Sequence, residues 1–255
     1  MLLSPNHKPS GFTLIELLVV ISIISLLSST VLTAISGIRN QARIAAGKRF
    51  ETSIRSSISN CSVAFYNFEG SGSIIREAGG TAPDGTAYGN PQRVKSVDGL
   101  GKALDLDGTN DWVSVGNDKS LQFSEEMTIS VWVNYDADDP DGRVLSKGAN
   151  NYALKTAKND INFKLTINGS QENIYTGSNT ISPNKWNHVM GTFDGQEMRV
   201  YLDGEEEATN SFSGKVNSNS NNLLFGVKTT GSSEGFIDAQ IDNVRLYDCA
   251  FKQNQ

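Results

Sequence analysis

The side chain with the clearest chemical consequence is Glu16, the one charge in an apolar run that reads G-F-T-L-I-E-L-L-V-V-I-S-I-I-S-L-L from Gly11 to Leu27. A carboxylate in the apolar part of a membrane-length segment is costly, and such residues are usually paired and functional. A secretory signal is cut after its apolar stretch, so an acidic residue near the front of that stretch has no role there. The pattern therefore predicts a paired, functional carboxylate at Glu16.

Two plainer interpretations of this segment remain open. Leu17 to Ile38 carries no charge over 22 residues, about 33 Å of helix, which is long enough for a plain membrane anchor. A secretory signal cut after Ala34-Ile35-Ser36 would also have small residues at the required spacing. Neither interpretation explains Glu16. The basic residues that follow would favour a cytoplasmic location for that side, namely Arg39, Arg43, Lys48 and Arg49.

Cysteine and histidine chemistry is sparse. The chain has two cysteines, Cys61 and Cys249, and two histidines, with no Cys-x-x-Cys pair, so a zinc site is not expected. Two cysteines in an exported chain indicate one disulfide bridge, with two unrelated thiols as the alternative. His188 has no serine or cysteine partner nearby in the sequence, and a structural role is expected for it.

An enzyme or lectin that acts on polysaccharides would use carboxylates or aromatic rings. Cleavage of a glycosidic bond needs two carboxylates at a defined separation. Residues 205–207 are three glutamates that directly follow a turn, so they cannot all share one face of a strand, and a solvated hairpin is expected there. Tryptophans can stack on sugar rings, but within strand patterns they are most often buried. Core packing is therefore expected for Trp112, Trp132 and Trp186.

Composition limits the functional classes further. The 255 residues leave room for one anchor helix and one large domain, and 24 glycines suit a turn-rich β protein. The formal net charge of −6 disfavours a nucleic-acid-binding surface as the main purpose.

The elements that must position these residues change type near Ser62. Before it, apolar residues recur every four positions, which continues a helix beyond the membrane: Ala42, Ala46, Phe50, Ile54 and Ile58. After it, the period becomes two, as in 161–167, where Ile161, Phe163, Leu165 and Ile167 alternate with Asn162, Lys164 and Thr166.

Turn signals separate the predicted strands, of which at least ten are expected in a two-sheet sandwich. Asn168-Gly169, Asp194-Gly195 and Asp203-Gly204 mark turns of an antiparallel meander. The other predicted strands are 127–135, 186–193, 198–202, two within 103–115 and a final long one at 237–247. In the last strand the apolar face shifts after Ile241, which predicts a bulge at Asp242-Asn243.

The segment G-F-T-L-I-E from Gly11 to Glu16 resembles the N-terminus of the type IV pilin and pseudopilin family. The resemblance implies a prepilin that a membrane peptidase cuts between Gly11 and Phe12, followed by N-methylation of Phe12. It also implies that the Glu16 carboxylate meets the new amino terminus of a neighbouring subunit during assembly. The motif is short but specific, because the Gly, the Phe, the Glu and the apolar stretch must all fall in register.

A second resemblance extends over nearly all of residues 62–248, to the laminin G-like, concanavalin A-like jelly roll. Six segments occur in family order: A-F-Y-N-F-E-G-S-G, K-A-L-D-L-D-G-T-N-D-W-V-S-V, M-T-I-S-V-W-V, N-K-W-N-H-V-M-G-T-F-D-G, R-V-Y-L-D-G and I-D-N-V-R-L-Y. The function that this fold implies is weakly defined, since it serves lectins, adhesins, glucanases and structural modules alike. The glucanase pattern Glu-x-Asp-x-x-Glu is missing from the sequence, so no enzymatic activity is expected.

The fold class expected is α+β, a long N-terminal helix followed by an all-β two-sheet jelly roll. The expected parts are a leader at 1–11, a transmembrane and assembly helix at 12–38, an amphipathic extension at 39–60, the jelly roll at 61–249 and a tail at 250–255.

The jelly-roll resemblance implies two further sites in this part of the chain. In such a sandwich the first and last strands lie side by side and antiparallel, which implies a Cys61–Cys249 disulfide. No cofactor is required, but a structural calcium at Glu69 and Asp242 is a further expectation, since these residues lie in segments that resemble family segments near calcium sites. So do Asp105, Asp107 and Asp111. The loop from Asp136 to Gly142 mimics a calcium loop, but it is misregistered and is expected to be a solvated turn.

The function expected is a minor pilin or pseudopilin that displays the jelly roll for adhesion to a glycan or an extracellular protein. Its partners would be the prepilin peptidase, other pilin subunits and, before assembly, membrane lipid. It would sit in a bacterial inner membrane by one N-terminal helix, with the jelly roll outside the cytoplasm, and then enter a pilus or pseudopilus. The alternatives are a pseudopilin of a type II secretion or DNA-uptake machine that contacts partner subunits alone, and a membrane-tethered glycan hydrolase.

Overall fold

The structure is a computed structural model that describes residues 11–97, 99, 101–136, 142–149, 151–157, 160–177, 180–231 and 235–253. The side chains of residue 30 and of residues 32–34 also fall outside the description. The chain divides into two compact units, residues 1–42 and 43–255. Most of the predicted calcium-mimicking loop, residues 137–141, lies outside the described residues.

One helix, α1, runs from Leu14 to Ile58 and joins the two segments predicted at 12–38 and 39–60. Within the described residues, no helix is long and apolar enough to cross a membrane, so the span expected at 12–38 is not confirmed. A short 3₁₀ turn, η1 (Ser59–Cys61), ends the helical region directly before the first strand.

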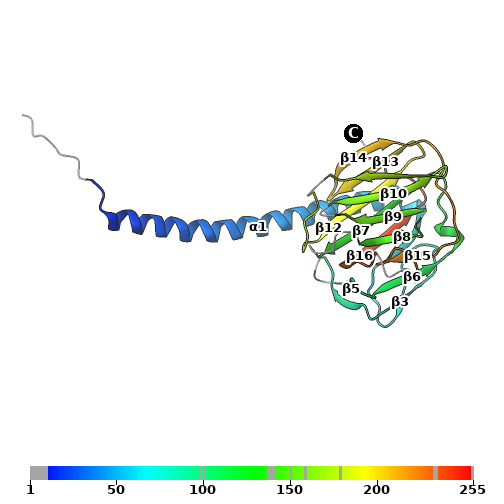
Figure 1. Cartoon of the computed structure of the whole chain (residues 1–255), viewed down its shortest axis with the longest axis horizontal. Helices are drawn as coiled ribbons and strands as arrows, with labels where there is room; N and C mark the ends of the chain where they lie inside the picture. The colour runs from blue at the N-terminus through cyan, green and yellow to red at the C-terminus, as the bar shows by residue number, and fades with distance from the viewer. Residues whose placement is uncertain are drawn as a thin grey trace, which may run out of the picture. The chain divides into compact units, whose positions relative to one another are not determined.

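The second unit, residues 43–255, is called the head here, and it contains two antiparallel sheets (Figure 1). Sheet A has the order β14-β13-β12-β7-β16-β5-β4, with β1 also paired to β16. Its strands are β1 (Ser62–Tyr66), β4 (Gln92–Lys95), β5 (Lys102–Asp107), β7 (Met127–Tyr135), β12 (Asn187–Phe193), β13 (Glu197–Leu202), β14 (Glu205–Ser211) and β16 (Asp238–Tyr247).

Sheet B has the order β11-β10-β9-β8-β15-β6-β3-β2. Its strands are β2 (Ile74–Ile75), β3 (Gly85–Tyr88), β6 (Trp112–Gly116), β8 (Arg143–Lys147), β9 (Tyr152–Thr156), β10 (Ile161–Ile167), β11 (Ser170–Tyr175) and β15 (Leu223–Phe225). A second 3₁₀ turn, η2 (Lys119–Leu121), lies between β6 and β7. The predicted fold class, a helix followed by a two-sheet jelly roll, is confirmed.

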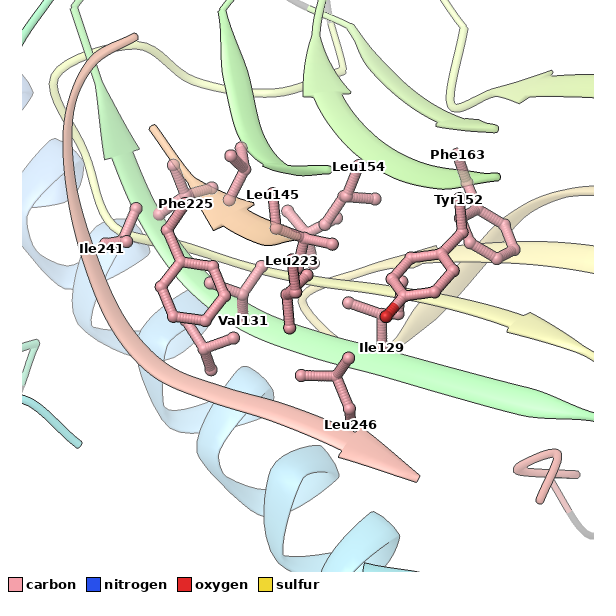
Figure 2. Packing of buried hydrophobic residues seen from close by; sticks show 14 of the residues in the cluster. Ile129, Val131, Leu145, Tyr152, Leu154, Phe163, Leu223, Phe225, Ile241 and Leu246 are labelled. Atoms are coloured by element: carbon pink, nitrogen blue, oxygen red, sulfur yellow. The ribbon is translucent and has the colours of Figure 1, made fainter. Parts of the chain in front are cut away.

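The core fills the space between the two sheets, as Figure 2 shows. Side chains from β7 and β16, such as Ile129 and Leu246, face side chains from sheet B such as Phe163. Alternation along β10 explains this arrangement, because Ile161, Phe163, Leu165 and Ile167 all enter the core. The intervening polar residues of β10 must then point to the opposite face of sheet B.

The outer face of sheet A is covered by the last turns of α1. Phe50, Ile54 and Ile58 form a second buried cluster with residues from β12, β13, β16 and the C-terminal segment, namely Met190, Tyr201, Tyr247 and Phe251. At Gly47 a side chain would not fit, since an added Cβ atom would lie 2.6 Å from Trp132 Cη2 and 3.0 Å from His188 Cβ. At this position the helix approaches the sheet too closely for any side chain larger than that of glycine.

Register details confirm several sequence predictions. The β16 ladder with β7 shifts between Asp242 and Arg245, and Asn243 has φ +49°, so the predicted bulge is present. Strand β1 lies antiparallel beside β16, as expected of the first and last strands. Residues 205–207 are exposed and begin the edge strand β14, which pairs with β13 across the turn at residues 203–204, so the predicted solvated hairpin is present.

Candidate functional site

The N-terminal site begins with the predicted processing position. Gly11 and Phe12 are exposed, and Thr13 directly precedes α1. Glu16 Oε2 accepts hydrogen bonds from Thr13 N at 2.9 Å and Thr13 Oγ1 at 2.8 Å, while Glu16 N donates to Thr13 Oγ1 at 3.2 Å. These reciprocal bonds are a capping box, which satisfies free N–H groups at a helix start. Glu16 thus has a local structural role that the sequence analysis missed, although the spacing Thr-x-x-Glu signals it.

The first unit leaves its apolar side chains uncovered. Phe12 is 88 % exposed and Leu14 is 89 % exposed, and as far as Ile38 every large apolar side chain that the structure describes is at least 40 % exposed. The serines between them return their hydroxyls to the helix, as Ser22 Oγ does to the Val19 carbonyl at 2.8 Å and Ser25 Oγ to that of Ile21 at 2.7 Å. Soluble proteins rarely expose so large an apolar surface unless it meets a partner or a membrane.

Within the head, two side chains of α1, Glu51 and Arg43, fix the helix to sheet A through polar contacts. Glu51 accepts a hydrogen bond from Trp132 Nε1 at 3.0 Å and pairs with Arg245 Nε at 3.2 Å. Both carboxylate oxygens are therefore engaged, one by each strand neighbour. Arg43 Nε pairs with Asp203 at 3.5 Å, and Arg43 Nη1 donates to Asn187 Oδ1 at 2.7 Å.

His188 lies fully buried in β12, beneath the helix. Its ring is 5.1 Å from Trp132 and 5.8 Å from Phe50, centroid to centroid, and Nε2 lies 2.8 Å from Ser130 Oγ. Burial lowers the pKa of His188 to about 4, so the ring is neutral at physiological pH. His188 is therefore packed between α1 and sheet A, away from solvent, in agreement with its expected structural role.

Asp203 lies in the turn after β13 and accepts a hydrogen bond from His188 N at 2.8 Å. Burial raises the pKa of Asp203 to about 6, and the backbone hydrogen bond and Arg43 counteract that shift. The two buried groups thus titrate in one acidic pH range, with opposite effects on stability.

The two cysteines form a disulfide. Cys61 and Cys249 are bridged with a Cα–Cα distance of 5.9 Å, and they lie beside the Phe50 cluster. Because β1 and β16 are antiparallel neighbours, the residue before one strand meets a residue just after the other. The bridge thereby joins the start of the first strand of the sandwich to the end of its last strand.

The predicted calcium residues have protein partners. Glu69 Oε1 accepts from Lys102 N at 3.0 Å, and Asp242 Oδ1 accepts from Asn243 N at 2.7 Å. Asp107 Oδ1 accepts three backbone N–H groups of its own turn, from Thr109 to Asp111. Among the described residues, no cluster of three or more acidic, histidine or cysteine ligands was found. A calcium site at Glu69 and Asp242 stays a prediction.

Core packing was the wrong prediction for two of the three tryptophans. Trp132 is fully buried, but Trp112 is half-buried and stacks on the exposed Tyr88, with ring centroids 4.2 Å apart and planes at 10°. Trp112 begins β6, directly opposite Tyr88 on β3, so both rings project from the outer face of sheet B. Trp186 is half-buried and precedes β12.

Among the described residues of the head, two surface hollows are similar in size. One, of about 460 Å³, lies between the end of α1 and β16 and is lined by Thr52, Arg55, Ser59, Arg245 and other residues. The other, of about 450 Å³, is lined by the Gly70–Ser73 turn, by Arg93 and by Lys102. In the second, both cations donate to backbone carbonyls, Arg93 to Phe68 and Gly72 and Lys102 to Gly70.

An exposed apolar helix behind a prepilin-type motif, joined to a lectin-type sandwich, defines a pilin-like protein with a binding-type domain. Residues 6–32 match the family described as "Prokaryotic N-terminal methylation motif". Residues 107–255 match the family described as "Concanavalin A-like lectin/glucanases superfamily". This second match covers more than half of the chain, and the protein belongs to that superfamily.

Solved structures share the fold of the head at low sequence identity. The binding domain of Paraclostridial Mosquitocidal Protein 1 is 18 % identical, with a TM-score of 0.63 over 76 % of this chain and 50 % of that one. The binding domain of botulinum neurotoxin DC, solved in complex with rat synaptotagmin II, is 16 % identical, with a TM-score of 0.60 over 77 % and 50 %. This chain thus spans about half the length of these structures, and no curated protein matches it.

Proposed function

We propose that this protein is a minor subunit of a type IV pilus-like filament and that its head binds a glycan or a protein outside the cell. The chain is inserted in the inner membrane by residues 12–38, cut between Gly11 and Phe12, methylated at Phe12 and then assembled with other subunits. The head acts as a binding module without enzymatic activity.

One observation carries the proposal most directly, the exposed apolar surface of α1 behind the processing motif. Phe12, Leu14 and Ile15 are each at least 74 % exposed. A membrane before assembly, and the helices of neighbouring subunits after it, would each remove this surface from water. The head has a separate, complete core, so the apolar helix is not needed to fold the sandwich.

Adhesion is supported by the class of the head. The superfamily description names lectins, and the neurotoxin domain with this fold was solved in complex with a protein, rat synaptotagmin II. Both observations concern other proteins, and they leave the choice between glycan and protein to experiment. A minor rather than a major subunit is proposed because a large head hinders the close packing required of every major subunit.

A pseudopilin of a secretion or uptake machine is the second candidate, favoured by the same motif and helix. The two candidates differ in where the assembled protein lies. Cells of the native host should be sheared mechanically, and the protein then measured in the sheared filament fraction and in the cell fraction.

Recovery of the protein with sheared filaments, and labelling of intact cells by antibodies to the head, is the expected result. A protein found in the cell envelope alone, and inaccessible to antibody in intact cells, would contradict the pilus proposal and favour the pseudopilin. Loss of adhesion without loss of filaments on deletion of the gene would support a role for the head in binding.

A further inference from the structure

The outer face of sheet B carries an ordered array of polar side chains. It can be followed through the strand registers. On β10, Asn162, Lys164 and Thr166 alternate with Phe163 and Leu165, which enter the core. The three polar residues therefore point away from the core, toward the outer face.

Each of these three residues has register partners on the neighbouring strands, and together they form a row across the sheet. The first row is Arg143 on β8, Lys155 on β9, Asn162 on β10 and Tyr175 on β11. The second is Ser146, Ala153, Lys164 and Asn173 on the same strands. The third is Asn151, Thr166 and Gln171, in which the Asn151 carbonyl accepts a hydrogen bond from Thr166 N at 2.7 Å. These three rows are called the polar array.

The polar array is large enough for an extended ligand. Strands are about 4.8 Å apart, and alternate residues along a strand about 7 Å apart, so the array measures roughly 14 Å in each direction. Its centre is Ala153, the smallest side chain of the second row, with the larger side chains around it. Ala153 is 3 % exposed, so the larger side chains of the array cover it and would have to move for a ligand group to reach it.

Buried polar atoms within the array lack hydrogen-bond partners. Both amide atoms of Asn162 and of Asn151, and Oγ1 of Thr166, are buried without a partner in the part of the chain that the structure describes. Asn162 is fully buried, and Asn151 is 1 % exposed. Buried polar groups are nearly always paired in native proteins, so five such atoms on one face point to a partner from outside the chain, either ordered water or a ligand.

The array also gathers positive charge in a chain whose formal net charge is −6. Arg143, Lys155 and Lys164 stand in its rows, and the charges of Arg143, Lys155 and Lys228 all act on Lys164. Burial and these three cations lower the pKa of Lys164. A ligand with a negative group would relieve this repulsion.

An exposed ring completes the array. Tyr175 is 47 % exposed and lies directly across from Asn162. These groups match the chemistry of an acidic saccharide. The amides can bond its hydroxyls, a cation can pair with its acid group, and the ring can cover the apolar face of a sugar.

We infer that the polar array is the ligand site of the head and that its ligand is an acidic polysaccharide. In this structure Lys164 Nζ donates to the Ala149 carbonyl at 3.1 Å. In the complex, the acid group of the ligand replaces that carbonyl as the partner of Nζ. Movement of the flexible Lys164 side chain uncovers Ala153 and the amides beneath. Sugar hydroxyls then pair with Asn162 and Thr166, and Tyr175 stacks on the sugar.

This inference rests on the proposed binding role of the head, but its test does not depend on filaments. The full chain, purified in detergent, should be titrated by calorimetry with polygalacturonate, with dextran sulfate, with neutral dextran and with a polyglutamate peptide. The first two probes separate a carboxylate from a sulfate, the third tests the need for charge, and the fourth tests a protein partner.

Three variants accompany the titrations. Lys164→Gln should weaken binding of the acidic polysaccharide roughly tenfold or more, because a charge-assisted hydrogen bond is lost. Tyr175→Ala, at an exposed ring that the fold does not need, should weaken it about fivefold. Lys185→Gln, an exposed lysine in the turn before β12 of sheet A, is the matched control and should leave binding unchanged.

The titrations of the parent and the three variants can support or overturn the inference. Binding of either acidic polysaccharide that falls in both array variants and not in the control supports the inference. Equal binding of dextran, equal binding of polyglutamate, or no binding of any probe would overturn it, and in the last case ordered water is the partner of the amides. Filament incorporation of Lys164→Gln should stay normal, so that a failed binding test and a failed filament proposal remain distinguishable.

Discussion

Glu16 accepts two hydrogen bonds from Thr13 within the chain, and in a filament the same carboxylate is proposed to meet the amine of a neighbouring subunit. The capping box uses one carboxylate oxygen, Oε2, so the other remains available to a second donor. The two roles can therefore be separated by substitution.

Glu16→Gln should preserve cleavage and the capping box, because an amide oxygen also caps a helix, but it removes the charge that would pair with a buried amine. Incorporation into filaments should fall roughly tenfold or more, since an unpaired buried charge is strongly destabilising. Thr13→Val is the control, because it loses the hydroxyl of the cap at about 1 kcal/mol and keeps the carboxylate. Quantitative blotting of sheared filaments measures both, and normal incorporation of Glu16→Gln would refute the assembly role.

His188 and Asp203 are adjacent buried groups with opposite pH behaviour. The pKa of His188 is about 4 in the folded state and about 6.5 unfolded, so its contribution to stability is present above pH 6.5 and lost as the pH falls toward 4. The pKa of Asp203 is about 6 folded and about 3.9 unfolded, so its contribution is present below pH 3.9 and lost as the pH rises through 6.

His188→Gln should therefore be less sensitive to acid than the parent chain. Between pH 6.5 and 4 the parent should lose on the order of 2 to 3 kcal/mol of unfolding free energy relative to this variant, while Asp203, present in both, cancels. Asp203→Asn should give a difference of the opposite sign. Denaturant titrations at several pH values, followed by tryptophan fluorescence, provide the numbers, and parallel pH profiles for parent and His188→Gln would disprove the assignment.

At the scale of elements, the contact of α1 with sheet A depends on Gly47. Gly47→Ala should lower the free energy of unfolding by about 1 to 3 kcal/mol, because the added methyl group meets the buried Trp132 ring. Gly37→Ala is the matched control, since nothing lies within 4 Å of its added Cβ, and it should raise helix stability by up to about 1 kcal/mol. Thermal unfolding decides, and equal effects of the two substitutions would count against close packing at Gly47.

Strands with strong alternation or clear turns were predictable from the sequence. Residues 127–135 and 161–167 coincide with β7 and β10, since buried apolar faces fix their period. The extent of the edge strand β14 was not predicted because its sequence is polar apart from Ala208, as edge strands often are. The short strands β2, β3 and β4 were missed as well, because two to four residues give no readable period.

The site residues divide in a similar way. The alternation in 161–167 predicts that Asn162, Lys164 and Thr166 share one face of their strand. The rows that they form with β8, β9 and β11 depend on strand registers that only the fold provides. The contacts of Glu51 with Trp132 and Arg245 join positions 81 and 194 residues apart, which no local pattern reveals.

At the scale of the whole molecule, the Cys61–Cys249 disulfide ties the first strand to the last over a separation of 188 residues. A double Cys→Ser variant should lose up to about 5 kcal/mol of stability, an upper figure from the chain entropy of so long a loop. Melting temperatures of the variant and of the parent with and without reductant test this. An unchanged midpoint would show that the bridge adds nothing beyond the packing of β1 on β16.

The central claim is that this chain is a processed, pilin-like subunit whose N-terminal helix serves assembly. Its most direct test is intact-mass analysis of the protein from membranes of its native host. A mature chain that starts at Phe12 and carries one extra methyl group on its amine is the predicted result. A chain that keeps residues 1–11, or one that starts at Gly37 after conventional signal cleavage, would contradict the account.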